Sequence, residues 1–186
     1  DWATVQNSMD NLISIMQAES TLKRVSLRLF ARILIKGNPE KENDGITPAS
    51  YNYTYNHLKN SPPGDEILKL IDKSSEDKTV ANLEAYMRPH KDNYIYGLFY
   101  YSHPYYSYGA LKNVKVQRRL TSDLLDISYT SGDPGIAYNT VSILMDEFVE
   151  EYRRIRYGET DKVIKYFEEE LKRIGKKLNS EEDDLT

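Results

Sequence analysis

Residues 133–178 read as one long amphipathic helix, and this feature limits the possible folds more than any other. Asp133 is a favourable N-cap, and Pro134 suits the first helical position, where a backbone N–H would have no partner. Apolar residues then recur three or four positions apart, first over residues 137–155 and again over residues 163–178. About 45 residues rising about 1.5 Å each span about 65 Å, more than the diameter of a domain of this size. The distal part is therefore predicted to project.

The two halves of this helix have different expected neighbours. The apolar stripe of residues 137–155 is expected to dock on its own domain. The domain is too small to cover the second stripe as well, so residues 163–178 are predicted to meet a partner helix or another subunit. Gly158 is the weak point between them, because glycine costs about 1 kcal/mol against alanine, and Thr160 is a candidate cap after a bend there. The predicted partner or oligomer contacts are Val163, Phe167, Leu171, Ile174 and Leu178.

The part before the long helix reads as a mixture of helices and a small sheet. Apolar spacing predicts a first helix over residues 6–35, ended by Gly37, Asn38 and Pro39. Residues 40–61 are polar and are expected to form a surface loop. Short helices are predicted over residues 65–72 and 75–87.

Two alternating segments predict an antiparallel β-hairpin. Val114 and Val116 alternate with polar residues, as do Leu125, Ile127 and Tyr129. Two strands alone are marginal, so a further strand is expected in the aromatic region or outside this sequence. The predicted class is α+β: a small antiparallel or mixed sheet packed with helices at the base, plus a long projecting C-terminal helix. The predicted organisation is a base over 1–132 with a tyrosine-rich insertion at about 40–108, the helix over 133–178 and a polar tail over 179–186.

Composition excludes several classes of function. The net charge of −4 argues against nucleic acid, which needs a cationic surface. The chain has no cysteine, so it has no disulfide framework, thiol nucleophile or thiolate zinc site. The histidines His57, His90 and His103 share no metal-ligand spacing. No phosphate-binding loop or nucleophile motif is present. We therefore expect no catalytic residue, metal or cofactor, and no enzyme.

The chain contains 16 tyrosines, many of them in residues 94–108. Such rings fill a core, form a protein interface or stack on sugar rings, since tyrosine has an apolar face and a polar hydroxyl. These three readings stay open at this point. If the segment contacts a glycan, the candidate residues are Tyr100, Tyr101, Tyr105 and Tyr106.

The stretch Asp123-Leu-Leu-Asp-Ile-Ser-Tyr-Thr-Ser-Gly-Asp-Pro-Gly-Ile-Ala137, a strand that runs into an Asp-Pro helix start, resembles the periplasmic domain of bacterial polysaccharide chain-length determinants, or polysaccharide co-polymerases. Two segments of the first helix, residues 12–16 and 20–25, are similar to the early periplasmic helix of that family. The likeness covers residues 7–36 and 108–178. The tyrosine-rich middle departs from it.

The resemblance implies a periplasmic domain between two inner-membrane helices, which would lie in flanking segments outside this sequence. It further implies a homo-oligomer that works with a polysaccharide polymerase and the growing glycan chain. Such proteins set the length of O-antigen, capsular or exopolysaccharide chains without a catalytic site in this part. Two alternatives remain: a glycan-binding module that uses residues 94–108, and a helical adaptor of unrelated function.

Overall fold

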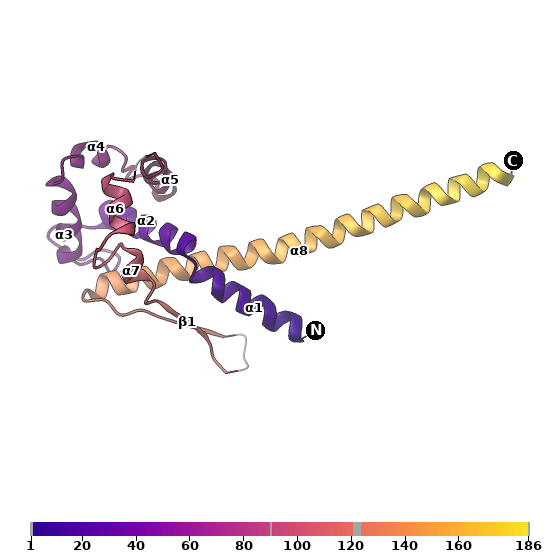
Figure 1. Cartoon of the computed structure of the whole chain (residues 1–186), viewed down its shortest axis with the longest axis horizontal. Helices are drawn as coiled ribbons and strands as arrows, with labels where there is room; N and C mark the ends of the chain where they lie inside the picture. Colours follow the sequence, from indigo (N-terminus) through magenta and orange to yellow (C-terminus); the bar gives the residue numbers. More distant parts are fainter. Residues whose placement is uncertain (1, 90, 121–123, 186) are drawn as a thin grey trace. The chain divides into compact units, whose positions relative to one another are not determined.

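The computed structural model describes residues 2–89, 91–120 and 124–185, with side chains described at 9–155, 158 and 161–180 within those ranges. The chain divides into two units, Asp1–Phe148 and Val149–Thr186, which we call the base and the arm. The fold is a mainly helical α+β fold with a two-stranded antiparallel sheet, as predicted (Figure 1). The elements are α1 Trp2–Met16, α2 Glu19–Lys36, α3 Pro48–Lys59, α4 Gly64–Leu68, α5 Glu76–Met87, α6 Tyr94–Tyr100, α7 Tyr108–Leu111, β1 Lys115–Arg118, β2 Leu125–Ser128 and α8 Pro134–Leu185.

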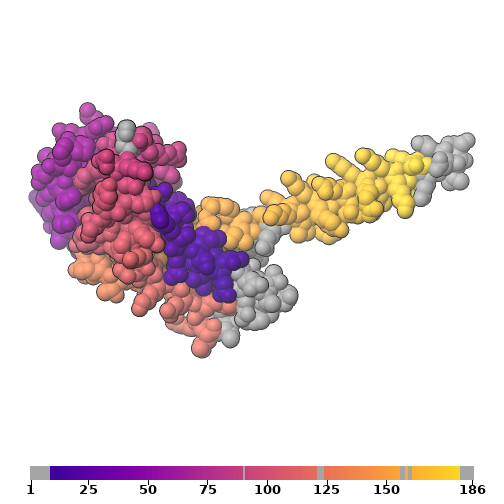
Figure 2. All heavy atoms as spheres, in the orientation of Figure 1, coloured from indigo at the N-terminus to yellow at the C-terminus, as the bar shows by residue number. Residues whose placement is uncertain are grey.

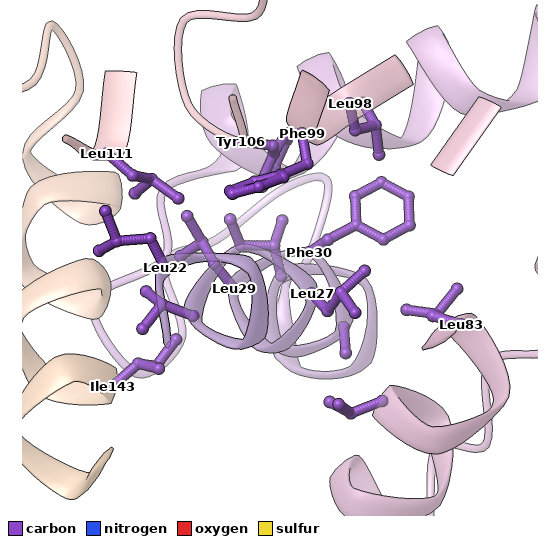
Figure 3. Close-up of a cluster of buried hydrophobic side chains, with 14 of the residues drawn as sticks. Leu22, Leu27, Leu29, Phe30, Leu83, Leu98, Phe99, Tyr106, Leu111 and Ile143 are labelled. Carbon is purple, nitrogen blue, oxygen red and sulfur yellow. The ribbon is translucent and has the colours of Figure 1, made fainter. Parts of the chain in front are cut away.

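Helix α2 is the centre of the base, with buried residues around most of its circumference. A helix that is apolar on several sides is one that other elements surround. Figure 3 looks along α2 and shows Leu22 directed toward Leu111 and Ile143, while Leu27 lies toward Leu83. Helices α1, α3, α5 and α7 all contact α2. The aromatic segment and the first turns of α8 thus share one core with α2.

The prediction of a single first helix over residues 6–35 is wrong, because the helix is interrupted between Met16 and Glu19. Ala18 takes an extended conformation, with φ −68° and ψ 147°. Thr21 Oγ1 donates to the carbonyl oxygen of Ile15 at 2.6 Å across the break. No glycine or proline marks this position; instead each helix packs on a different neighbour, since α1 also contacts β1. The predicted stop is confirmed, with Gly37 as the C-cap of α2.

The predicted loop over residues 40–61 is also wrong, because it contains α3. Thr47 caps this helix by accepting a hydrogen bond from the backbone N–H of Ser50 at 3.2 Å, and Pro48 takes the first helical position. Both are ordinary start signals that the polar composition concealed. The helix predicted over residues 75–87 is confirmed as α5, which Ser75 caps, whereas the helix predicted over residues 65–72 is the shorter α4 and ends at Leu68.

The aromatic segment forms α6 and α7, so the described part of it adds no strand to the sheet. Asn93 caps α6 through Tyr96 N–H, and Ser107 caps α7 through Ala110 N–H. The predicted hairpin is confirmed: β1 and β2 pair antiparallel with Val116 opposite Ile127. Over the described residues the sheet therefore has two strands, and it gains its stability by packing on α1 rather than on a third strand.

The start of α8 is fixed by Asp133, as predicted. Its Oδ1 accepts from the backbone N–H groups of Gly135 at 2.8 Å and Ile136 at 3.2 Å. Its Oδ2 accepts from Ser50 Oγ at 2.6 Å, which ties the new helix to α3. The first turn of α8 also lies close to the backbone at Gly45. Gly135 makes this possible, since a Cβ there would lie 2.4 Å from the carbonyl oxygen of Gly45.

Helix α8 continues to Leu185, so the predicted end at Leu178 and the separate polar tail over residues 179–186 are wrong. No glycine or proline follows Leu178, and the backbone has no local reason to leave the helix there. The helix also runs unbroken through Gly158. Thr160 was the candidate cap after a bend at Gly158, and its side chain lies outside the described side chains.

Candidate functional site

The first candidate site is the apolar stripe of the arm. Every predicted contact residue is exposed there, with fractions between 49 and 69 % for Val163, Phe167, Leu171, Ile174 and Leu178. Among the described residues, nothing covers these side chains. Clustered exposed apolar residues of this size mark an interaction surface.

One exposed apolar residue of this surface, Ile164, was not among the contact residues predicted from the sequence. Ile164 is 49 % exposed and completes an alternation of three and four residues along the helix. Such spacing is the a/d pattern of a coiled coil, in which each side chain enters a hole on a facing helix. Val163 then lies beside the stripe rather than in its line. We call the following five residues the arm seam: Ile164, Phe167, Leu171, Ile174 and Leu178.

Charged residues flank the arm seam. Glu170 Oε2 accepts a hydrogen bond from Arg173 Nη2 at 2.8 Å, an exposed pair on the same helix. Exposed pairs of this kind contribute at most about 1 kcal/mol, so a partner helix can rearrange them at little cost. The surface therefore has an apolar centre and a polar rim, as interfaces between helices do.

The second candidate site is the tyrosine-rich segment, and the structure separates its four predicted residues. Tyr106 is 1 % exposed. Its hydroxyl pairs with Thr54 Oγ1, its carbonyl accepts from Ser26 Oγ at 2.6 Å, and its ring meets Phe30 edge-on at 5.4 Å. Tyr106 therefore belongs to the core and does not offer its ring to a ligand (Figure 3).

Tyr105 is half-buried and helps to enclose a histidine that sequence spacing does not place near any other. The His103 ring lies 6.0 Å from the His57 ring, although 46 residues separate them in the chain. His103 Nδ1 accepts from the backbone N–H groups of Tyr105 at 3.0 Å and Tyr106 at 3.3 Å. Burial, and next the nearby His57, lower the pKa of His103 to about 4. This histidine is neutral at physiological pH and acts as a structural acceptor.

Of the four predicted glycan-contact residues, Tyr100 and Tyr101 are the exposed ones, at 38 and 58 %. In Figure 2 the segment around residue 100, in rose, lies on the visible face of the base. An open hollow of about 560 Å³ adjoins both rings. Of the four predicted glycan-contact residues, the structure therefore brings two to a surface hollow and leaves two in or against the core.

Within the described residues, no group of three or more histidine and carboxylate side chains is arranged to hold a metal ion. Across that same part of the chain, no helix has the length and apolarity to cross a membrane.

Comparison with known proteins adds nothing to these two surfaces. No protein-family model matches the chain, and no curated protein and no solved structure matches it. Its function is therefore inferred from its own residues.

Proposed function

We propose that the chain is the non-catalytic part of a bacterial regulator that sets the length of a surface polysaccharide, either O-antigen, capsule or exopolysaccharide. It acts on the periplasmic side of the inner membrane by assembling with further copies of itself, beside the polysaccharide polymerase and the growing chain. The observation that carries the proposal is the exposed arm seam, with its alternating spacing on one helix.

A second feature supports the same reading. Strand β2 runs into a helix that begins at Asp133 and Pro134, which is the arrangement on which the likeness to chain-length determinants depends. The Asp133 carboxylate is held by four neighbours, because Gly135, Ile136, Ser50 and Thr47 all donate to it. These hydrogen bonds attach the start of α8 to the rest of the base.

The length of the arm seam explains why regulation by assembly suits it. Its five apolar positions cover about two heptads, fewer than the three or four over which such a pattern indicates a coiled coil by itself. A pair of arms on its own is therefore weak. Copies confined to one membrane have a high effective concentration, and several weak contacts then hold an assembly together.

The charges beside the arm seam permit neighbours that point the same way, as copies anchored in one membrane do. In a parallel, in-register pair, a residue preceding each a position faces the residue five places further along the other helix. Glu170 of one copy then faces Gly175 of the next, and Val163 faces Glu168. No like charges meet at these positions.

The test is a seam variant in the bacterium that encodes the protein. Replacing Phe167, Leu171 and Ile174 with Gln keeps the helix, because Gln is a good helix former, but removes the apolar surface. We expect the modal length of the surface polysaccharide to change while polymer is still made. Gel electrophoresis of the extracted polysaccharide measures this.

The matched control changes the opposite face of the same helix. Lys162, Glu169 and Lys176 are exposed and lie away from the seam, so their replacement with Gln should leave the length distribution unchanged. An unchanged distribution in the seam variant would overturn the proposal and favour a helical adaptor of another function. Complete loss of polymer would equally contradict it, since a length regulator is not the polymerase.

A further inference from the structure

Helix α6 and its C-cap residue Tyr101 hold three tyrosine rings in a fixed group on the surface of the base. Tyr96 and Tyr100 are stacked, with ring centroids 4.3 Å apart and planes 27° from parallel. Tyr101 meets Tyr96 edge-on at 6.0 Å. Both arrangements are ones that aromatic pairs prefer. The outer rings of this group, Tyr100 and Tyr101, are therefore held by a third ring rather than left free to rotate.

Two more contacts fix Tyr101. Its hydroxyl donates to the carbonyl oxygen of Lys91 at 3.4 Å. Its ring lies so close over Gly97 that a Cβ added there would be 3.2 Å from Tyr101 Cδ2. Glycine at this position lets the ring lie against the helix. Rings that are fixed before binding lose little entropy when a ligand arrives.

The hollow beside these rings carries no formal charge at neutral pH. Its lining contains Tyr100, Tyr101, Ser102, His103 and Ser107, together with a proline, a glycine and an alanine. His103 is neutral because burial, and next the nearby His57, lower its pKa to about 4, and its Nδ1 accepts two backbone N–H groups. Burial and the neighbouring Glu19 carboxylate raise the pKa of Tyr100, so its phenol stays protonated. The residues that line the hollow thus offer aromatic faces and hydroxyl groups, and none of them is charged.

This chemistry separates the possible ligands. A phosphate or an acidic sugar would need an arginine or lysine in the lining, and none is present. Single-stranded nucleic acid also stacks on aromatic rings but needs a basic groove. A purely apolar ligand prefers a deeper, more enclosed site. A neutral sugar unit fits, because its C–H face packs on an aromatic ring while its hydroxyl groups exchange hydrogen bonds with serine and tyrosine.

We propose that Tyr100, Tyr101 and the adjoining hollow form a binding subsite for a neutral sugar unit of a glycan chain. Tyr101 supplies the more exposed face, Tyr100 the second face, and Ser102 the polar edge, whereas the Ser107 hydroxyl is buried and bonded to the backbone of His103 and Ala110. The subsite lies in the base and uses no residue of the arm seam. It therefore stands independently of the proposed function.

The experiment is a titration of the purified chain with neutral oligosaccharides. The probes are hexasaccharides of α-linked glucose, β-linked glucose, mannose and galactose, with a hyaluronan hexasaccharide as the acidic comparison. Saturation-transfer NMR and calorimetry detect binding. We expect at least one neutral probe to bind with a Kd of about 0.1–1 mM, the range in which a few stacked and hydrogen-bonded groups place a ligand. The acidic probe should bind less well.

Variants locate the binding. Tyr101→Ala should weaken it about tenfold, whereas Tyr101→Phe keeps the ring and should change affinity about twofold. Tyr138→Ala is the matched control, because Tyr138 is 64 % exposed in the base and does not line this hollow. Thermal unfolding of each variant, expected to match the parent chain, shows that an exposed ring was removed without loss of fold.

Three outcomes would overturn the subsite: no binding of any neutral probe at 10 mM, a preference for hyaluronan, or equal losses in Tyr101→Ala and Tyr138→Ala. The variant with Gln at Phe167, Leu171 and Ile174 distinguishes failure of the subsite from failure of the proposed function. It should bind the same oligosaccharide with unchanged affinity, so failure of either idea leaves the other standing.

Discussion

Helix α2 and the distal part of α8 carry similar apolar patterns with opposite outcomes. In α2 the pattern is buried on several sides, and Leu22, Leu29 and Phe30 are at most 1 % exposed. In the arm, side chains of the same kinds stand about half or more in solvent. Periodicity thus predicts that a segment is helical, but what covers the stripe depends on how many neighbours the rest of the chain supplies.

The sharpest test of this comparison makes the same substitution in both helices. Phe30→Ala should lower the free energy of unfolding by about 3–5 kcal/mol, because it leaves a cavity and removes the edge-on contact with Tyr106. Phe167→Ala should change it by less than about 0.5 kcal/mol in the monomer, since its ring is 60 % exposed. Urea unfolding at low protein concentration measures both. Equal losses would mean that the arm is covered in the folded monomer.

The next test compares ion pairs in the two regions. Glu76 begins α5 and accepts from Arg32 Nε and Nη2 at 3.0 and 2.8 Å and from Arg28 Nη1 at 3.0 Å. Although burial opposes it, these hydrogen bonds lower the pKa of Glu76 below its usual value. Glu76→Gln should therefore cost about 3 kcal/mol, because Arg32 loses its counter-charge and Arg28 keeps only the exposed Asp77 at 2.9 Å.

The matched control in the arm is Glu170→Gln, which removes an exposed pair with Arg173 and should cost less than about 0.5 kcal/mol. Because the pKa of Glu76 is lowered in the folded state, its stabilisation is present above pH 4.5 and is lost as pH falls below that value. Glu76→Gln should remove this part of the acid sensitivity. A variant as acid-sensitive as the parent chain would contradict the assignment to Glu76.

The parts of the fold that local chemistry determines were predictable from the sequence. Asp133 and Pro134 mark the start of α8 by themselves, and alternation over β1 and β2 defines the hairpin. The break at Ala18 was not predictable, because no residue there disfavours a helix and only packing on different neighbours separates α1 from α2. Helix α3 was missed for a different reason: its start signal at Thr47 was present but lay inside a polar stretch.

The candidate sites also include a part that the local sequence predicts and a part that depends on packing. The arm seam followed from spacing, apart from Ile164. In the tyrosine-rich segment, composition did not distinguish the buried Tyr106 from the exposed Tyr101, because neighbouring rings on an irregular backbone point in different directions. The meeting of His57 with His103 also depends on the packing of α3 against the later segment, which no local pattern records.

The last and smallest effect concerns His103, a buried side chain of the base. Its pKa is lowered from 6.5 to about 4 in the folded chain, first by burial and next by His57. Between these values the unfolded chain binds the proton and the folded chain does not, so stability is full above pH 6.5 and falls as pH drops toward 4. We expect a loss of about 2 kcal/mol over this window.

The variant His103→Asn assigns that loss. The Asn side-chain oxygen can accept from the same backbone N–H groups as His103 Nδ1, but it does not titrate in this range. Urea unfolding at a series of pH values should therefore show a flatter profile between pH 6.5 and 4 than in the parent chain. The same slope in both proteins would mean that other groups cause the acid sensitivity and that burial of this ring does not set it. A flatter slope would show that the base encloses this side chain tightly enough to hold it neutral.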